Sequence, residues 1–474
     1  MLTKTKEIIK LPIFKALISL AFPIILANLF QAMYQLTDSF WVGRLGGAAL
    51  AAVSICSPII FLTVSLGIGF AVAGSTFVAQ YFGAKNFKMV SHAAAQTIIM
   101  ITFTSIVFSV LGFIFAPHIL TLMGAKPDFF PMALSFLRIS FIAIIANFSF
   151  FIFQSIMRGI GRPNIPVFIV VGTVLLNFIL DPLFIFGFGP IPASGPAGAA
   201  LATLMTQTIA AIIGFSILFG GKHGIRLKIN DFIPDFKFIK RSFFIGLPSS
   251  VEQSARNLGM VFITSLVAGF GTTAVASFGA GANLTQIAMF FGIGLAVANG
   301  TLVGQNIGAK NISQAIKVSK ISAVLSFFTL TFIGLLSFIF SKNFVSFFVP
   351  SDLAVINGGS QFVKITAIAF GFIGLQMSFG NVFLAAGKTT TSMLLTIFSQ
   401  WGVLVPIAYF LSQHTPLGVN GLWLAFPIAN FIAATMAFII YRHGSWQKSR
   451  IIDDEKITGQ VAEETIVEEG VHQA

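Results

Sequence analysis

Two aspartates of this chain lie inside long apolar stretches, where a charge is costly. Asp38 lies near the end of an apolar stretch from Phe14 to Val42, and Asp181 follows the apolar sequence VLLNFIL. A carboxylate at membrane depth is rare unless it has a partner or a function. Of the 15 acidic residues, only these two and Glu252 fall within apolar stretches. The pair predicts a site for a proton or a monovalent cation. An acid at a helix end, or one that makes a structural hydrogen bond, is the plain alternative.

Amide side chains precede each aspartate at helical spacing. The first stretch carries polar residues at positions i, i+4 and i+7, namely Gln31, Gln35 and Asp38, with Tyr34 beside them. This spacing places them on one helix face. Asn177 and Asp181 are likewise four residues apart. A low-dielectric cavity favours the neutral form of a carboxyl group, so two such acids could share a proton or hold Na⁺. Two unrelated structural acids are the alternative.

The elements that position these residues are set by an apolar composition. The chain has 474 residues, of which 56% are hydrophobic and 9% charged, whereas about a quarter of the residues of a soluble domain are charged. Apolar runs of about 20 residues or more recur, and each suits a transmembrane helix. We therefore predict an all-α integral membrane protein. Its twelve transmembrane helices are expected at residues 14–42, 50–82, 91–116, 131–157, 165–187, 197–220, 239–268, 273–305, 315–341, 355–385, 391–412 and 420–441.

The net charge of +13 is explained by where the basic residues lie relative to these spans. With the N-terminus in the cytoplasm, most of the 28 Lys and Arg residues fall in cytoplasmic segments, and only Arg44, Lys126 and Lys342 fall on the other side. This asymmetry is the positive-inside rule. It predicts a multi-pass protein of the cytoplasmic membrane with both termini inside, and it removes nucleic acid as the explanation of the charge.

Signals for enzyme chemistry or a cofactor are weak. The single cysteine, Cys56, excludes an internal disulfide framework. None of the six histidines lies in the middle of an apolar stretch, so no histidine metal cluster or proton relay is predicted. The sequence LAAGKTT imitates a phosphate-binding loop, but the glycine required five residues before Gly387 is Val382. We expect a protein that is not an enzyme and needs no cofactor beyond H⁺ or Na⁺.

The chain repeats itself. Residues 67–86 and 292–311 are identical at 13 of 20 positions, and the same offset of 225 aligns Pro23 with Pro248. The repeat predicts two six-helix lobes, residues 1–230 (the N-lobe) and 231–450 (the C-lobe), followed by an acidic disordered tail at 451–474. Six helices per copy keep both copies in one orientation, related by an axis along the membrane normal, with substrate handled between them. A channel could also be built from repeats, but two unequal lobes fit transport better.

The repeat also shows where symmetry is broken. Asp38 aligns with Ile263, and Asp181 aligns with the apolar residues 405–407. Glu252 aligns with Ala27. Because neither aspartate has an acidic counterpart, the cation chemistry is predicted to belong to the N-lobe.

Two further features have both a structural and a functional interpretation. Glu252 and Arg256 are four residues apart, and an intrahelical ion pair would reduce the cost of burying either charge. The alternative is a contact for a cationic substrate. Pro23 removes a backbone hydrogen bond inside the first helix and permits a kink. Its counterpart Pro248 makes a fixed, architectural kink an equal alternative to a moving hinge.

Several motifs resemble the multidrug and toxic compound extrusion (MATE) family. They are LAFPIILANLFQAMYQLTDSFWVGRLGGAALAAVS, QSIMRGIGRPN, LNFILDPLFIFGFG, GPAGAALATL and GLPSSVEQ, within residues 14–442. The pattern is similar to the DinF-like branch of that family. The resemblance implies a V-shaped fold of two lobes, a cation site, a fourth-helix amide and a bend-forming proline. The cation site maps onto Asp38, Asn177, Asp181 and Thr203. The fourth-helix amide maps onto Gln154, and the bend-forming proline maps onto Pro23.

The NorM-like branch differs in its cation site. The resemblance places that site on acids of the seventh, eighth and tenth helices, and here only Glu252 could match. This departure argues against a sodium site in the C-lobe.

These observations predict a monomeric antiporter, coupled to H⁺ or Na⁺, that exports amphipathic cationic organic compounds and drugs. Its substrate cavity would be lined by Gln31, Tyr34, Gln35, Gln154, Glu252 and Arg256, with lipid around it. The rival is a flippase for lipids or lipid-linked precursors. Such a cavity would need several basic residues for phosphates, and the spans hold only Arg138, Arg256 and Lys364. A receptor or channel conflicts with the unequal lobes and the buried acids.

Overall fold

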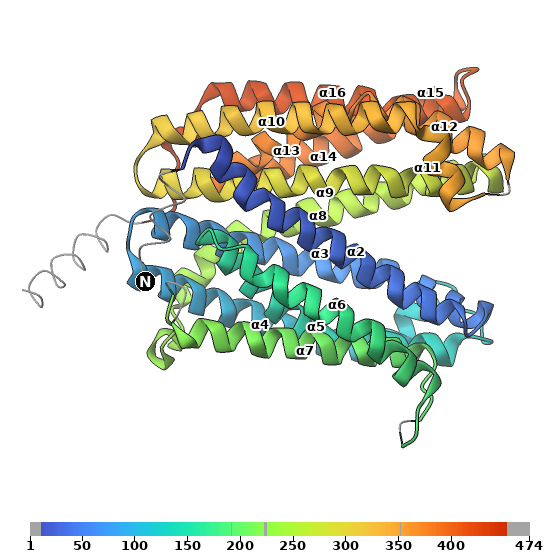
Figure 1. Cartoon of the computed structure of the whole chain (residues 1–474), viewed down its shortest axis with the longest axis horizontal. Helices are drawn as coiled ribbons and strands as arrows, with labels where there is room; N and C mark the ends of the chain where they lie inside the picture. Colours follow the sequence, from blue (N-terminus) through green and yellow to red (C-terminus); the bar gives the residue numbers. More distant parts are fainter. Residues whose placement is uncertain (1–10, 191, 222–224, 351, 453–474) are drawn as a thin grey trace, which may run out of the picture.

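The computed structural model describes residues 11–190, 192–221, 225–350 and 352–452, and every element in these ranges is helical (Figure 1). The N-lobe contains α2 (Ile13–Gly43), α3 (Gly47–Gly83), α4 (Phe87–Leu122), α5 (Phe130–Gly159), α6 (Asn164–Phe186) and α7 (Pro196–Gly220). A short 3-10 turn, η1 (Ile229–Phe232), lies in the linker between the lobes. The predicted all-α fold is confirmed. Most of the predicted acidic tail lies outside the described residues.

The C-lobe contains more helical segments because several of its spans are broken. It comprises α8 (Phe236–Ala268), α9 (Thr272–Gly308), α10 (Ile312–Ile339), α11 (Ser341–Phe348), α12 (Leu353–Ala367), α13 (Phe370–Ala385), α14 (Thr389–Ile397), η2 (Phe398–Leu404), α15 (Val405–Gln413), α16 (Val419–His443) and η3 (Ser445–Lys448). The predicted tenth span is a pair, α12 and α13, bent by 51°. The predicted eleventh span contains a π-helical turn, η2, between α14 and α15.

The described helices account for the predicted spans, with one exception in composition. Ten are long and apolar enough to cross a membrane, and the bent pair makes an eleventh. The remaining predicted span, the seventh along the chain, is α8. It has 33 residues, but polar residues lower its hydropathy. Several of these are buried: Ser242, Ser249, Ser250 and Glu252. Because they face protein and not lipid, they do not oppose a membrane-spanning position.

Backbone geometry confirms the parallel repeat. Lys85 and Lys310, which occupy equivalent positions, both have a φ of 60°. Each is followed by an asparagine that caps the next helix: the Asn86 side chain accepts from the Met89 N–H, and the Asn311 side chain accepts from the Gln314 N–H. An αL residue before an N-cap turns the chain sharply. The two copies of the GAKN motif therefore make the same turn.

The lobes meet through their first two helices, in pairs related by the repeat. α3 packs on α8, and α2 packs on the equivalent α9. A Cβ added to Gly69 would lie 2.1 Å from the Ser250 N, and one added to the equivalent Gly294 would lie 2.3 Å from Ile25 Cγ1. Side chains at these glycines would separate the helices. The contacts follow an approximate two-fold axis.

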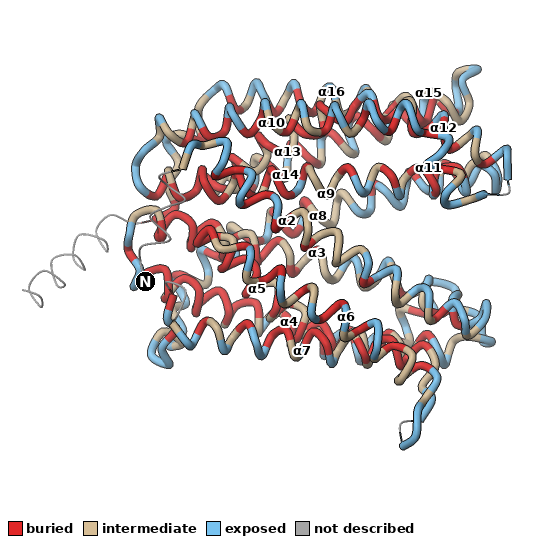
Figure 2. The backbone as a smooth tube through the Cα atoms, viewed as in Figure 1, coloured by how far each residue is buried: buried red, intermediate tan, exposed pale blue. Residues whose placement is uncertain are grey.

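Contact between the lobes is concentrated at one end of the bundle. We call it the basic end, because Lys85, Arg158, Lys310 and Lys388 belong to its turns and helix ends. The lobes diverge toward the opposite, open end (Figure 1). Figure 2 shows long buried stretches on α3 and α9 toward the basic end, within residues 67–82 and 292–308. Toward the open end, Leu36 and Val261 on the first helix of each lobe are exposed.

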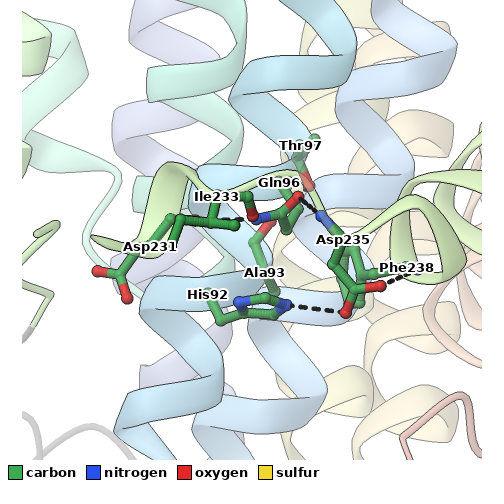
Figure 3. Close-up of polar contacts among 8 residues, drawn as sticks. All are labelled: His92, Ala93, Gln96, Thr97, Asp231, Ile233, Asp235 and Phe238. Carbon is green, nitrogen blue, oxygen red and sulfur yellow. Dashed lines mark hydrogen bonds and ion pairs between the residues drawn. The ribbon is translucent and has the colours of Figure 1, made fainter. Parts of the chain in front are cut away.

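The linker between the lobes is fastened to α4 of the N-lobe (Figure 3). The Gln96 amide Nε2 donates to the carbonyls of Asp231 and Ile233, at 2.8 Å each, and its Oε1 accepts from the Asp235 N–H at 2.9 Å. His92 Nε2 lies 3.4 Å from Asp235 Oδ2. The Asp235 carboxylate also caps α8 through the Phe238 N–H. The start of the C-lobe is thus held against the N-lobe at the basic end.

Candidate cation site in the N-terminal lobe

Asn177 and Asp181 form the buried part of the candidate site on α6. Their spacing of four residues places them on the face of α6 that packs against α2 and α7. Both side chains are 0% exposed. The Asn177 Nδ2 donates to Asp181 Oδ1 at 3.0 Å. This single donor leaves the second oxygen of Asp181 without a hydrogen-bond partner.

Asp38 lies near them on α2 of the same lobe. Its partly buried carboxyl group lies within interaction range of the side chains of Asp181, Asn177 and Thr203. Three buried acceptor oxygens have no hydrogen-bond partner here: Asp38 Oδ1, Asp181 Oδ2 and Asn177 Oδ1. Buried polar atoms are nearly always paired, so a group of unpaired acceptors needs an explanation.

A bound cation or proton is the simplest explanation. Ionised carboxylates only accept hydrogen bonds, whereas a protonated carboxyl group supplies an O–H donor. One proton on Asp38 or Asp181 would therefore satisfy an oxygen of the other. The same carboxylate, amide and hydroxyl oxygens also fit Na⁺, since hard cations take oxygen ligands. Asp38, Asn177, Asp181 and Thr203 would hold the ion.

Tyr34 and Thr206 close the site on the side toward the basic end. The Tyr34 hydroxyl is 2.5 Å from Thr206 Oγ1, and both side chains are buried. Thr206 Oγ1 also donates to the Ala202 carbonyl, so Tyr34 is held from α7. Sequence reasoning chose Thr203 and missed Thr206. The sequence did carry a signal for Thr206, because it lies three residues after Thr203 and so on the same face of α7.

Among the described hydrogen bonds, none joins the other predicted N-lobe residues to the two acids. Gln154 is buried, and its Oε1 accepts from Arg158 Nη2 at 2.7 Å, while its Nε2 has no hydrogen-bond partner. Gln35 is exposed and Gln31 partly buried on α2. Pro23 is buried, and α2 continues through it as one helix.

The C-lobe has a separate acidic group on α8 and α14. Arg256 Nη2 donates to Glu252 Oε1 at 3.3 Å, and the Thr396 hydroxyl donates to the same oxygen at 2.9 Å. Glu252 Oε2 is buried without a partner. The Trp401 indole N–H donates to the Ala255 carbonyl at 3.0 Å. Trp401 lies within η2, and π-helical turns are frequent at functional sites.

Two parallel helical lobes with acids facing inward on broken or proline-containing helices are the features of a secondary transporter. The family model MatE matches residues 23–183 and, a second time, residues 248–410. The chain therefore belongs to the MATE family, whose members are membrane transporters and not enzymes.

Similar proteins support this membership along the whole chain. The probable multidrug resistance protein YpnP of Bacillus subtilis is 28% identical, over 94% of this chain and 98% of that protein. The probable multidrug resistance protein YoeA of the same organism is 26% identical, over 90% and 93%. A crystal structure described as MATE in complex with MaL6 superposes with a TM-score of 0.88 at 24% identity, covering 94% of this chain and 99% of that one. That structure shows the shared fold.

Proposed function

We propose that this transporter is an antiporter that couples uptake of H⁺ or Na⁺ to export of amphipathic, cationic organic compounds. The observation that carries the proposal is the group of three unpaired oxygens around Asp38 and Asp181. The position of both acids in the N-lobe supports membership of the DinF-like branch of the family. The names of the similar Bacillus proteins, both probable multidrug resistance proteins, support drugs as the substrate class.

Membrane orientation follows from the basic end. Lys and Arg concentrate in cytoplasmic segments of membrane proteins, so the basic end faces the cytoplasm. Because the lobes are in contact there and diverge at the other end, the structure is the outward-facing state. In that state a cation would enter from the open end and would have to reach a site in which the Asp181 side chain is fully buried.

Exchange would arise from competition between states. Uptake of the cation by Asp38 and Asp181 must stabilise one conformation more than the other, because a ligand shifts an equilibrium only by its differential affinity. We infer that cation uptake contracts the N-lobe site and expels substrate. A bend of α2 near Pro23 is the proposed motion.

The structure supports an antiporter over a lipid flippase. The three cations within the spans already have neighbours: Arg138 lies over the Phe113 ring at 4.9 Å, Lys364 lies over the Phe338 ring at 5.7 Å, and Arg256 pairs with Glu252. They lie on α5, α12 and α8. A phosphate site needs several cations or N–H donors that converge on one point. No such convergence exists among these three.

Transport in proteoliposomes tests the proposal. The purified chain is reconstituted, and export of a fluorescent cationic dye is measured with a pH gradient and a sodium gradient imposed separately. We expect one of the two gradients to drive export, and the Asp38→Asn variant to lose this response. Dye movement that is independent of both gradients, or equal in the variant, would contradict cation coupling through the N-lobe.

A further inference from the structure

The basic end of the bundle is held closed by two hydrogen bonds related by the repeat. Gln80 on α3 donates through Nε2 to the Ala385 carbonyl of α13 at 2.8 Å. Gln305, its equivalent on α9, donates through Nε2 to the Gly159 carbonyl of α5 at 2.9 Å. Each bond joins one lobe to the other. Both glutamines are buried, where loss of a donor leaves a carbonyl unsatisfied.

Backbones of the two lobes also touch beside these bonds. A Cβ added to Gly83 would lie 1.9 Å from the Gln305 carbonyl oxygen, and one added to Gly308 would lie 1.9 Å from the Gln80 carbonyl oxygen. Such close approach requires glycine. Each lobe therefore contributes one glutamine and one glycine to this symmetric contact.

The chain breaks this symmetry after α16. A segment that we call the strap, residues 449–452, crosses from the C-lobe to the N-lobe. It begins beside Trp446, which is buried in the C-lobe, stacks on Tyr441 and donates its indole N–H to the Tyr441 carbonyl. Ser449 Oγ then donates to the Ala386 carbonyl at 2.9 Å. The strap is thus anchored in the C-lobe.

Its far end is inserted into the N-lobe. Ile451 and Ile452 are buried in a hydrophobic cluster formed mainly by N-lobe residues, and Ile451 also lies against Gly387 of the C-lobe. The Ile451 N–H donates to Gln80 Oε1 at 3.0 Å, so the side chain of Gln80 joins α3, α13 and the strap. Arg450 still bonds within the C-lobe, where its Nη2 donates to the Gly308 carbonyl of α9 at 3.1 Å.

We propose that the strap is a conformational latch, which holds the basic end closed and must leave the N-lobe before that end can open. Burial of the two isoleucines and the hydrogen bond from the Ile451 N–H to Gln80 would favour the outward-facing state. The linker, fastened to α4 by Gln96, crosses at the same end, but it joins consecutive helices and needs no release. The proposal rests on the alternation between two states that is proposed above.

Distances between spin labels at the basic end test the latch. The labels are placed on Lys88→Cys in the N-lobe and on its repeat equivalent Ser313→Cys in the C-lobe, both exposed, with Cys56→Ala to remove the native thiol. The strap variant is Ile451→Ala with Ile452→Ala. Its control is Ile440→Ala, which truncates an isoleucine that belongs to the cluster around Trp446 and not to the cluster that the strap enters. We expect the strap variant to raise the ratio of long to short distances about tenfold or more, and the control to leave it unchanged.

A second pair of variants separates the strap from the symmetric bonds. Gln80→Leu and Gln305→Leu each remove one cross-lobe bond, but only Gln80→Leu also removes the acceptor of the Ile451 N–H. Gln80→Leu should therefore shift the distances further than Gln305→Leu, even if the double isoleucine variant fails to fold. Equal distances in the folded strap variant and its control, or equal shifts in the two glutamine variants, would overturn the latch. Labels are read without substrate or gradient, so a failure of export does not affect the outcome.

Discussion

The N-lobe and the C-lobe each bury acid between their first and fifth helices, yet the two groups differ in position and in pairing. Asp38 and Asp181 have two oxygens without partners and no cation near them in the described contacts. Glu252 Oε1 accepts from both Arg256 and Thr396, although its Oε2 also lacks a hydrogen-bond partner. Glu252 lies eleven residues before Ile263, the position equivalent to Asp38, which is about 16 Å along a helix. The C-lobe acid is therefore nearer the basic end.

This difference indicates different roles. A carboxylate that already has a guanidinium beside it gains less from binding a cation, because the favourable interaction is already made. Two unneutralised acids side by side gain more, since a proton or Na⁺ also removes their repulsion. The N-lobe is thus the part of the molecule that would respond to the cation.

Neutralising either N-lobe acid should have the largest effect on transport. Asp38→Asn and Asp181→Asn each remove a charge that the cation must meet. We expect each to reduce gradient-driven export by about 5- to 150-fold, the usual range of a coupling free energy. Dye export from proteoliposomes measures this, and size-exclusion chromatography in detergent checks the fold. Wild-type export by either variant would remove the acid pair from the mechanism.

Moving the acid to the C-lobe should not restore transport. Ile263→Asp in the Asp38→Asn background places a carboxylate at the equivalent position, which is 0% exposed. The neighbouring fifth-span positions, 403–407, are apolar, so the new charge has no partner. We expect no recovery of export, and a loss of stability of about 3 to 5 kcal/mol, as for a buried uncompensated charge. Thermal unfolding and dye export measure the two outcomes. Recovered export would show that the lobes are interchangeable.

Changing the C-lobe acid should have a smaller effect. Glu252→Gln keeps an oxygen that accepts from Thr396 and loses only the charge that pairs with Arg256. We expect a decrease in export of about fivefold or less, equivalent to one hydrogen bond. Thr396→Val is the matched variant, since it removes the other donor to the same oxygen. Selective loss of the sodium response in Glu252→Gln, with the pH response intact, would place the coupling site in the C-lobe instead.

The proline of α2 should have the smallest effect. Pro23→Ala restores a backbone donor inside α2 and should stiffen it, which reduces the response of the α2 shape to external pH by about two- to fivefold. Because low pH supplies the neutral form of the acids, a bent α2 is expected at low pH and a straight one at high pH. Spin labels along α2 report the bend, and Pro248→Ala in α8 is the control. The same α2 geometry at both pH values, with export intact, would leave rigid-body movement as the mechanism.

Much of the fold could be predicted from simple sequence patterns. Runs of apolar residues predict spans because an uncharged helix is the form in which a backbone crosses lipid, and the 13 identities of the repeat predict two equivalent lobes. The breaks were not predicted. The bend between α12 and α13 and the π-helical turn at 398–404 occur inside stretches that hydropathy predicts as single spans, and hydropathy carries no information about backbone geometry.

The sequence by itself determined the kind of chemistry at the candidate site. A carboxylate in an apolar stretch can be recognised as a candidate site residue from the sequence alone, because its burial cost does not depend on which helix it contacts. The spacing of Asn177 and Asp181 likewise determined their hydrogen bond within α6. The tertiary structure decided the partners that come from other helices. Thr206 contacts Tyr34 across 172 positions, and Gln80 contacts Ile451 across 371. Contacts at such separations depend on how the lobes pack, and local spacing along the chain does not encode that packing.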